Sequence, residues 1–455
     1  MFTYGPLFKI KAALFHSDII VVGDHAAVQH ILANTFTYMK SPSLRPITAN
    51  IIGKGLLWSE GADHVFQRRL LSPAFTLGNV KGMGNDISDC AEKLASTLTT
   101  LALSNASGLT LNIASYTTRC TLDIIGRVAF GHDFKFGESI ESREIMEAWN
   151  DVLNTGTTFG GFLGPIVIRA FPPIVSHSLK HVQSQGKIKT ITETLAQRII
   201  EGGSQNDKRM NILSVLLRSL GTTGGLSKIQ IIDNISTFIM AGQETMSTAL
   251  NFALMELARS PQVQQKLRDE LQQCRDALSY DAIQTLEYLD AVTKEVLRLH
   301  SPAPLTERVA TKDDVLPLTT PIRMSNRTFS TSFRVQKGQV FHIPLMSMNI
   351  NPKVWGEDAG EFKPERWLTP NAIRPSNELP HGWSNMMTFS DGPRLCIGYR
   401  LAVFEFKVIL ATLLRSLEFH STDATVNTKL SLTLQPVVEG RCGILPLRIT
   451  VASHN

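Results

Sequence analysis

The sequence feature that most constrains this chain is the decapeptide FSDGPRLCIG at residues 389–398. It presents a single cysteine, Cys396, in a loop bounded by Gly392 and Gly398. Glycine permits positive φ and close approach of the backbone, so peptide N–H groups can point at the sulfur and hold it as an anion. The neighbouring Arg394 adds positive charge. We therefore expect a loop that directs a thiolate toward a metal.

The segment after the cysteine supports the same interpretation. An apolar-periodic helix is expected over residues 397–417, and its positive N-terminal end would lie beside Cys396 and favour the thiolate. A structural zinc site needs about four protein ligands, and no C-x-x-C spacing occurs in the chain. Haem needs only one thiolate. The alternative is an ordinary core cysteine beside a turn, the usual situation of a free cysteine.

The decapeptide resembles the signature of the cytochrome P-450 family, F-x-x-G-x-R-x-C-x-G, which is matched at Phe389, Gly392, Arg394, Cys396 and Gly398. The resemblance implies that the cysteine is the axial ligand of the iron of haem b. It also implies that the aromatic ring packs near the sulfur and that the arginine contacts a haem propionate. The phrases QRRLLSPAF and EFKPERW are similar to the fungal microsomal branch of that family.

Composition agrees with a globular enzyme. The 455 residues are 43% hydrophobic and 19% charged, and no linker, repeat or low-complexity tract divides them, so one domain over residues 1–455 is expected. Five scattered cysteines argue against a disulfide framework and for a reducing compartment. The net charge of +5 is too small to indicate nucleic acid, and fits an acidic protein partner or an anionic membrane surface.

The expected fold is mixed α/β and predominantly helical, of the cytochrome P-450 type. Small sheets are expected near residues 8–40, 308–345 and 418–452, and the run at residues 19–22 is expected to be a strand. The resemblance implies that haem lies between a long central helix and the loop of Cys396.

The N-terminal region lacks the roughly 20 consecutive apolar residues that a membrane span requires. Eukaryotic relatives usually begin with an anchor, and here the match starts inside the first sheet, so we expect a shortened N-terminus without a transmembrane segment. The expected location is the cytosolic surface of the endoplasmic reticulum or the cytoplasm. Apolar residues crowd Gly160–Val175, which is interpreted as a peripheral membrane contact or a buried connection between helices.

The central helix is expected to start at Ser227, which forms a capping box with Gln230, and to continue to Arg259 over about 33 residues. The segment AGQET at residues 241–245 lies midway along it. A threonine within a helix usually bonds back to a carbonyl and carries no further role. The segment also resembles the oxygen-binding groove of the family, which implies that Glu244 and Thr245 deliver protons and that Ala241 lies against haem.

A second helix is expected to carry Glu295 and Arg298, which share one helical face. An exposed pair of this kind contributes only tenths of a kcal/mol. The resemblance implies that the two side chains pair instead with Arg366, from the PERW segment, in a buried structural network.

Haem is a dianion through its propionates, so the fold must supply cations. The resemblance implies that His64, Arg68 and Arg308 join the arginine of the cysteine loop around these propionates. Taken singly, each is more typical of a solvated surface charge. Arg69 and Lys407 are expected to form a basic patch that docks an acidic electron-transfer partner.

The resemblance implies a monooxygenase that hydroxylates or epoxidises a lipophilic small molecule, such as a terpenoid or steroid, using O₂ and electrons from an NADPH-dependent flavoprotein reductase. Two alternatives stay open at this point: a haem-thiolate isomerase, dehydratase or peroxide-using enzyme, and a non-catalytic haem protein that binds a ligand. Five mostly apolar residues are expected to line the substrate site, which indicates an apolar ligand. They are Phe238, Ala241, Pro304, Leu305 and Ile444.

Overall fold

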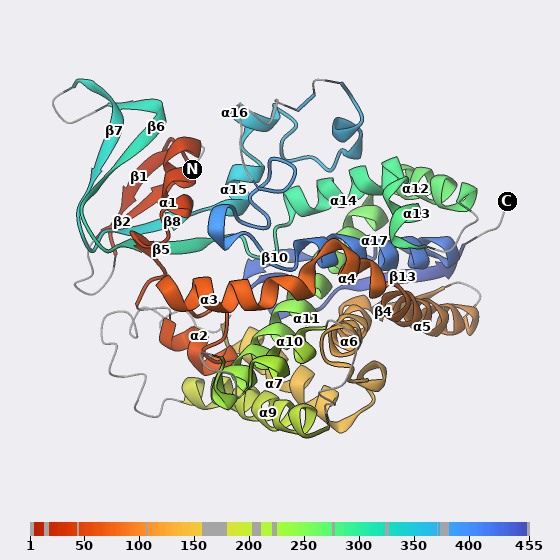
Figure 1. Cartoon of the computed structure of the whole chain (residues 1–455). Coiled ribbons are helices and arrows are strands. Elements are labelled where there is room, and N and C mark those ends of the chain that lie inside the picture. Colours follow the sequence, from red (N-terminus) through yellow and green to blue (C-terminus); the bar gives the residue numbers. More distant parts are fainter. Residues whose placement is uncertain are drawn as a thin grey trace.

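The computed structural model describes residues 4–12, 18–42, 45–105, 108–156, 180–202, 211–220, 225–274, 278–323, 327–370, 372–373 and 382–452. Helices predominate in this part of the chain (Figure 1). They are α1 His25–Ala33, α2 Arg45–Ile52, α3 Gly61–Leu71, α4 Leu77–Gly82, α5 Gly84–Leu103, α6 Ile113–Ile125, α7 Ile140–Gly156, α9 Lys180–Gly202, α10 Ile212–Ser219, α11 Lys228–Arg259, α12 Pro261–Gln273, α13 Tyr280–Gln284, α14 Glu287–Leu299, α15 Leu345–Asn349, α16 Pro352–Trp355 and α17 Tyr399–Ser416.

The strands form four small sheets within the described residues. One has the order β1-β2-β8-β5-β3, from Leu7–Ile10, Ile19–Val22, Val340–Ile343, Thr306–Ala310 and Tyr38–Met39. The others are the hairpin β6 Asp314–Arg323 with β7 Phe329–Val335, the sheet β10 Asn427–Leu430, β11 Leu434–Val438 and β12 Arg441–Cys442, and the sheet β4 Leu109–Asn112, β13 Pro446–Val451 and β9 Leu417–His420.

This arrangement corrects the expected sheets in two ways. The first two expected regions are not separate, because β2 pairs with β8 in parallel and thereby joins chain segments more than 300 residues apart. The last region is divided between two sheets, one of which takes its edge strand β4 from a segment that the sequence did not indicate. The strand expected at residues 19–22 is confirmed.

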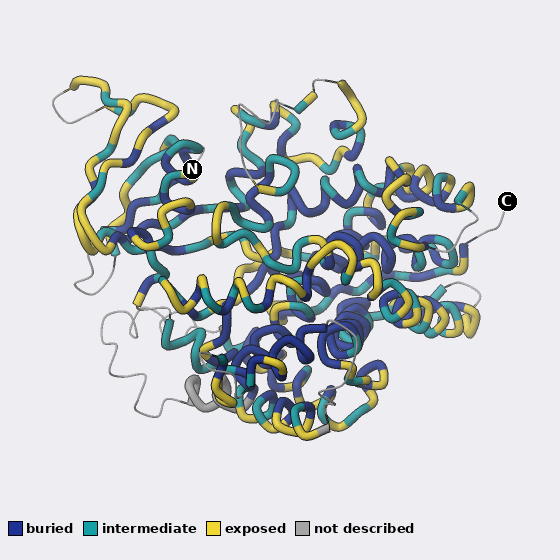
Figure 2. Tube along the Cα trace, in the orientation of Figure 1, coloured by how far each residue is buried: buried dark blue, intermediate teal, exposed yellow. Residues whose placement is uncertain are grey.

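The central helix α11 is confirmed with its predicted start. Ser227 accepts a hydrogen bond from the Gln230 amide, the Gln230 side chain accepts one from the Ser227 amide, and the helix runs for 32 residues, or about 48 Å. Most of its side chains are buried, and Figure 2 shows its trace dark blue in the middle of the molecule. Gly242 faces α6, where an added Cβ would lie 2.7 Å from the Ile125 side chain, so the glycine permits the two helices to pack closely.

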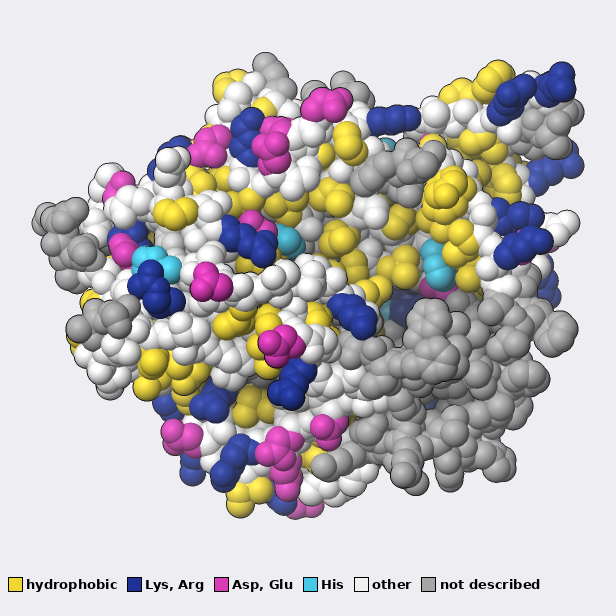
Figure 3. Space-filling view, turned by 180° about the vertical axis from the view of Figure 1, so that it is seen from behind, with side chains coloured by type: hydrophobic (Ala, Val, Ile, Leu, Met, Phe, Trp, Pro, Cys, Tyr) yellow, Lys and Arg dark blue, Asp and Glu magenta, His cyan; other side chains and the backbone are white. Residues whose placement is uncertain are grey.

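The β6–β7 hairpin projects from one side of the molecule. Its inner side chains Leu316 and Leu318 are buried, and it is anchored to α1 by Asp24, whose carboxylate accepts from the amides of Thr319 and Thr320 at 2.9 and 3.0 Å. Figure 3 shows hydrophobic and basic side chains together on its outer surface.

No described helix is both long and apolar enough to cross a bilayer. The segment Gly160–Val175, interpreted above as a membrane contact or a buried connection, lies outside the described residues.

Candidate active site

The cysteine loop is built on one backbone pairing and two glycines with different functions. The amide of Cys396 donates to the Phe389 carbonyl at 2.8 Å, which closes the loop. Gly392 adopts φ +63° as expected, and its Cα approaches the Leu32 carbonyl so closely that an added Cβ would lie 3.0 Å from that oxygen. Gly398 has φ −93°, so the expected positive φ is wrong at that position. Its amide donates to the Cys396 sulfur, and its Cα lies against the ring of Phe75.

Cys396 differs from the four other cysteines. Three of those are buried and Cys274 is half-buried, whereas Cys396 has an exposed side chain. Protein nevertheless surrounds it, since desolvation raises the pKa of its thiol while the Gly398 amide and Arg68 lower that pKa. An exposed residue with a desolvated thiol is consistent with a position at the edge of a ligand site. The signature aromatic Phe389 is half-buried, with its ring edge-on to Trp383 at 5.3 Å.

A cluster of basic side chains surrounds a single carboxylate near this loop. Arg394 donates to the Ser59 carbonyl at 2.9 Å and forms an ion pair with Glu60. Lys40 reaches the same carboxylate at 3.4 Å. Arg308 is buried, and its guanidinium donates to the Thr306 hydroxyl at 2.7 Å.

Burial and mutual repulsion lower the pKa values of the basic groups in this cluster. Burial, with repulsion from Arg394 and Arg308, lowers the pKa of Lys40 to about 7 despite attraction by Glu60. Burial lowers the pKa of Arg308 to about 10, again with repulsion from Arg394. His64 is buried, and burial and three neighbouring cations lower its pKa to about 3, which leaves the imidazole neutral at physiological pH.

These residues fit a dianionic cofactor. Two propionates would supply the negative charge that Lys40, Arg308 and Arg394 lack, and Arg68 lies close enough to Cys396 to influence its titration. The structure brings His64, Arg68, Arg308 and Arg394 into one cluster, and their contact with propionates stays a prediction. The sequence analysis missed Lys40 and Glu60. Neither lies in a recognisable motif, and only the fold brings Lys40 beside Arg308.

In the middle of α11, Ala241 and Thr245 are less buried than most residues of the helix. Ala241 is exposed and Thr245 is half-buried, although most of the helix is buried on all sides. The Thr245 hydroxyl donates to the Ala241 carbonyl at 2.7 Å, the local bond common for threonine within helices. An open patch on an otherwise buried helix is consistent with a helix that borders a ligand site.

Glu244 lies in a separate polar environment. It is buried, and its carboxylate accepts from the Thr433 hydroxyl at 2.8 Å and from the Gln435 amide at 2.7 Å. Burial raises its pKa, and the hydrogen bonds from Thr433 and Gln435 oppose the shift. Among the described residues, no hydrogen bond joins it to Thr245.

The predicted substrate residues do not all lie together. Phe238 is buried, with its ring 5.7 Å from Phe75, the residue that also contacts the cysteine loop. Pro304 is half-buried and Leu305 is 40% exposed. Ile444 is placed differently, because it lines a cavity beside Glu244 on the side of α7 and β12.

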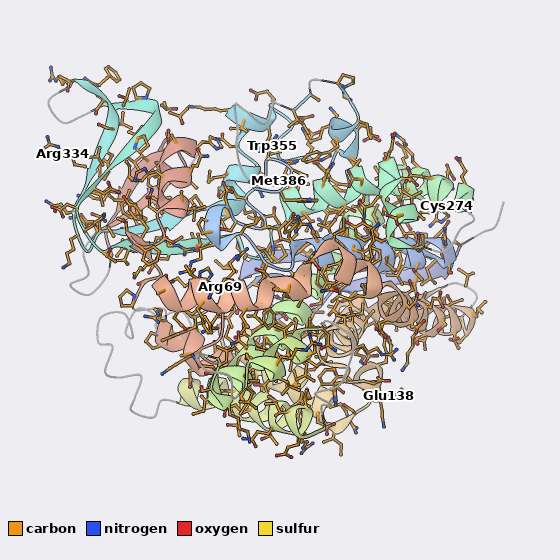
Figure 4. The ribbon with its side chains drawn as sticks, in the orientation of Figure 1. Arg69, Glu138, Cys274, Arg334, Trp355 and Met386 are labelled. Carbon is orange, nitrogen blue, oxygen red and sulfur yellow. The ribbon has the colours of Figure 1, made fainter. Side chains whose placement is uncertain are left out.

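The network of Glu295, Arg298 and Arg366 is present and buried. Arg298 donates to both carboxylate oxygens of Glu295 at 2.9 and 2.8 Å, and Arg366 donates to the same carboxylate at 2.8 Å. Trp367 adds an indole N–H at 2.9 Å. The Arg298 guanidinium also lies 5.3 Å from the ring of Trp355, which Figure 4 labels beside Met386.

This network is connected to the cysteine loop through Asn349. Arg298 donates to the Asn349 carbonyl at 3.0 Å. The Asn349 side chain accepts from the Met387 amide at 2.8 Å and donates to the Thr388 hydroxyl at 2.9 Å, immediately before Phe389. The network therefore fixes the segment that leads into the loop.

The proposed docking patch needs a correction. Lys407 is only 1% exposed and pairs with Asp290 at 2.7 Å inside the fold, so it cannot present a charge to a partner. Lys407 lies on the buried face of α17, and its ammonium group contacts Asp290 of α14. Arg69 is exposed on α3, where Figure 4 labels it.

Comparison with known proteins identifies the family to which this fold and cysteine loop belong. The family pattern "Cytochrome P450", here written cytochrome P-450, matches residues 2–439. The chain is 31% identical to cytochrome P-450 monooxygenase claQ of Ampulloclitocybe clavipes, covering 98% of this chain and 86% of the relative. It is 32% identical to ganoderic acid synthetase of Ganoderma lucidum, in an alignment that covers 96% of this chain and 85% of the relative.

The chain belongs to the cytochrome P-450 family, with fungal monooxygenases among its homologues. Members of this family are oxidoreductases that incorporate oxygen and carry a haem iron. They generally use a redox partner, O₂ and a small-molecule substrate.

Proposed function

We propose that this protein is a single-domain monooxygenase that binds haem b and hydroxylates or epoxidises a lipophilic small molecule. It would take O₂ and electrons from an NADPH-dependent flavoprotein reductase. The observation that carries the proposal is the exposed Cys396 beside a cluster in which Lys40, Arg308 and Arg394 repel one another around Glu60. When bound, the haem iron activates O₂, and thiolate donation promotes cleavage of the O–O bond.

The residues around the site would divide the remaining tasks. Burial raises the pKa of the Cys396 thiol, and the Gly398 amide and Arg68 oppose that shift and so favour the thiolate that would bind iron. The basic cluster holds the propionates, and the burial of Arg308 excludes water from that edge. Arg69 remains exposed on α3 and is a position at which an acidic reductase surface would dock.

Proton supply would depend on Thr245 and Glu244. The Thr245 hydroxyl lies on the open patch of α11 and can rotate from the Ala241 carbonyl to donate a proton into the ligand site. Glu244 has a raised pKa, so its carboxyl can hold and release a proton at a higher pH than an exposed glutamate.

Thr245→Ala and Glu244→Gln are expected to retain haem and substrate binding but to divert electrons from NADPH to peroxide, because protons arrive too slowly. Product formed per NADPH should fall about tenfold, a loss within the range for one acid–base group. Thr412→Ala is a matched control, since this α17 threonine makes the same local bond, to the Val408 carbonyl at 2.8 Å. Unchanged coupling in both α11 variants would remove their proposed role.

We propose that the substrate is apolar and lies against Ala241, Phe238, Pro304 and Leu305. Ala241→Phe should fill space over the cofactor and change the position of oxygenation or block turnover, whereas Ala241→Ser should preserve the product pattern. The measurement is the product profile of each variant, co-expressed with a reductase and supplied with a panel of terpenoids and steroids. An identical profile for the phenylalanine variant would place the substrate elsewhere.

We propose that the protein works at the cytosolic surface of the endoplasmic reticulum membrane, with the β6–β7 hairpin contributing to contact. Phe329 is 72% exposed at the hairpin end, and Arg323, Arg327 and Arg334 are exposed nearby. An aromatic side chain among exposed arginines suits an anionic lipid surface (Figure 3).

Vesicles of phosphatidylserine should therefore sediment the protein more strongly than vesicles of phosphatidylcholine. Replacing Phe329 by Ser and the three hairpin arginines by Gln should remove that difference, because both the apolar and the electrostatic attraction are lost. Retention of the full difference in the quadruple variant would exclude the hairpin as the contact.

A further inference from the structure

A cavity of about 410 Å³ lies on the side of α11 that carries Glu244, between α6, α7 and the strands β11 and β12. Cys396, Ala241 and Thr245 do not line it. Its inner wall is made of buried polar side chains, and its outer wall of exposed ones. The cavity therefore reaches from the surface to the acid of the central helix without passing through the cysteine site.

The outer wall is strongly basic. Arg119, Arg143 and Arg441 line the cavity, from α6, α7 and β12. Within the described part of the chain none of the three makes an ion pair or a side-chain hydrogen bond, although Arg119 lies 5.5 Å from the ring of Tyr116. The lining carries two carboxylates, those of the exposed Glu147 and the buried Glu244, against these three guanidinium groups.

The rest of the lining is partly apolar. Met146, Leu153 and Ile444 also line the cavity. The volume lies within the range of about 300–1,000 Å³ that is usual for small-molecule sites. Guanidinium groups bind carboxylates through paired N–H donors. A ligand for this cavity would combine a carboxylate with an apolar body.

We propose that this cavity is a second ligand site, distinct from the substrate site, that binds an amphipathic monocarboxylate. The carboxylate would lie between Arg143 and Arg441, and the apolar body would extend along Met146 and Ile444 toward Glu244. An oxidised apolar product that carries a carboxylate belongs to this chemical class. A bound ligand would also displace water from beside Glu244 and lower the coupling of NADPH use to product, an effect that rests on the proposed function. Binding itself does not.

The test uses the haem-loaded protein saturated with an azole that ligates the iron and occupies the substrate site. Isothermal titration with decanoate should then show binding, while decanol, which lacks the charge, should bind far more weakly. The Arg143→Gln/Arg441→Gln double variant should weaken decanoate binding by about tenfold or more, the loss expected for charge-assisted hydrogen bonds. Arg259→Gln, at the C-terminal end of α11 and outside the cavity lining, is the matched control.

The contrary outcomes are equally definite. Decanoate that fails to bind the azole-saturated protein, or that binds the double variant and the wild type equally, would overturn the proposal. Decanol that binds as tightly as decanoate would show that the arginines do not select the ligand. Because the titration involves no turnover, its failure leaves the monooxygenase proposal untouched, and loss of turnover leaves the binding result untouched.

Discussion

Arg298→Ala is expected to lower the free energy of unfolding by about 3–5 kcal/mol and to prevent stable incorporation of haem. The substitution would leave the fully buried Glu295 carboxylate without its bidentate partner. It would also remove the donor for the carbonyls of Asn349 and Ala359. A loss of this size is a large part of the roughly 5–15 kcal/mol that stabilises a folded domain.

The effect should reach the cofactor because Asn349 holds the backbone at Met387 and the hydroxyl of Thr388. Loosening that segment loosens the entry to the cysteine loop. The measurement is urea unfolding together with the haem content of the purified protein. Lys294→Ala is the matched control on the same helix, since its pair with Asp290 is partly exposed and should contribute less than about 1 kcal/mol. Equal stability and full haem loading in Arg298→Ala would show that the network does not support the loop.

The elements specified by local chemistry could be predicted from the sequence. The start of α11 follows from the capping box of Ser227 and Gln230, and its end follows from Ser260 before Pro261, because these residues act within one helical turn. The positive φ at Gly392 could also be predicted, because a tight turn that needs positive φ favours glycine at that position.

The failures concern residues whose function is decided by distant partners. Gly398 resembles a turn glycine in the sequence, but its φ is negative. The need for glycine at this position is better explained by its contact with Phe75 and by its amide, which donates to the Cys396 sulfur. Lys407 is a charged residue of a type that is mostly exposed, but its pairing with Asp290 on α14 holds it inside the fold. Strand β4 is too short to show alternation and exists because β13 pairs with it.

The candidate site shows the same division. Motifs indicated Arg68, Arg308 and Arg394, whereas Lys40 is drawn into the cluster by the pairing of β3 with β5. Glu244 and Ile444 were assigned to different tasks from sequence, and the fold places both at one cavity. Side-chain direction on a long helix depends on packing, which spacing alone does not reveal.

The central claim is that Cys396 supplies the thiolate that ligates the haem iron. Cys396 is an exposed residue whose sulfur accepts a hydrogen bond from the Gly398 amide, whereas Cys90 and Cys120 are buried in the hydrophobic core. Loss of the thiolate should remove both the characteristic ligand field and the activity. Cys396→His should keep haem through an imidazole nitrogen, so that loss of thiolate character is separated from loss of cofactor.

The most direct measurement is the absorption spectrum of the reduced carbon monoxide complex. The wild-type protein and the Cys274→Ala control should show the band characteristic of thiolate ligation. That band should be absent in Cys396→Ala and replaced in Cys396→His by the band of a histidine-ligated haem protein. A wild-type spectrum in either Cys396 variant would contradict the assignment.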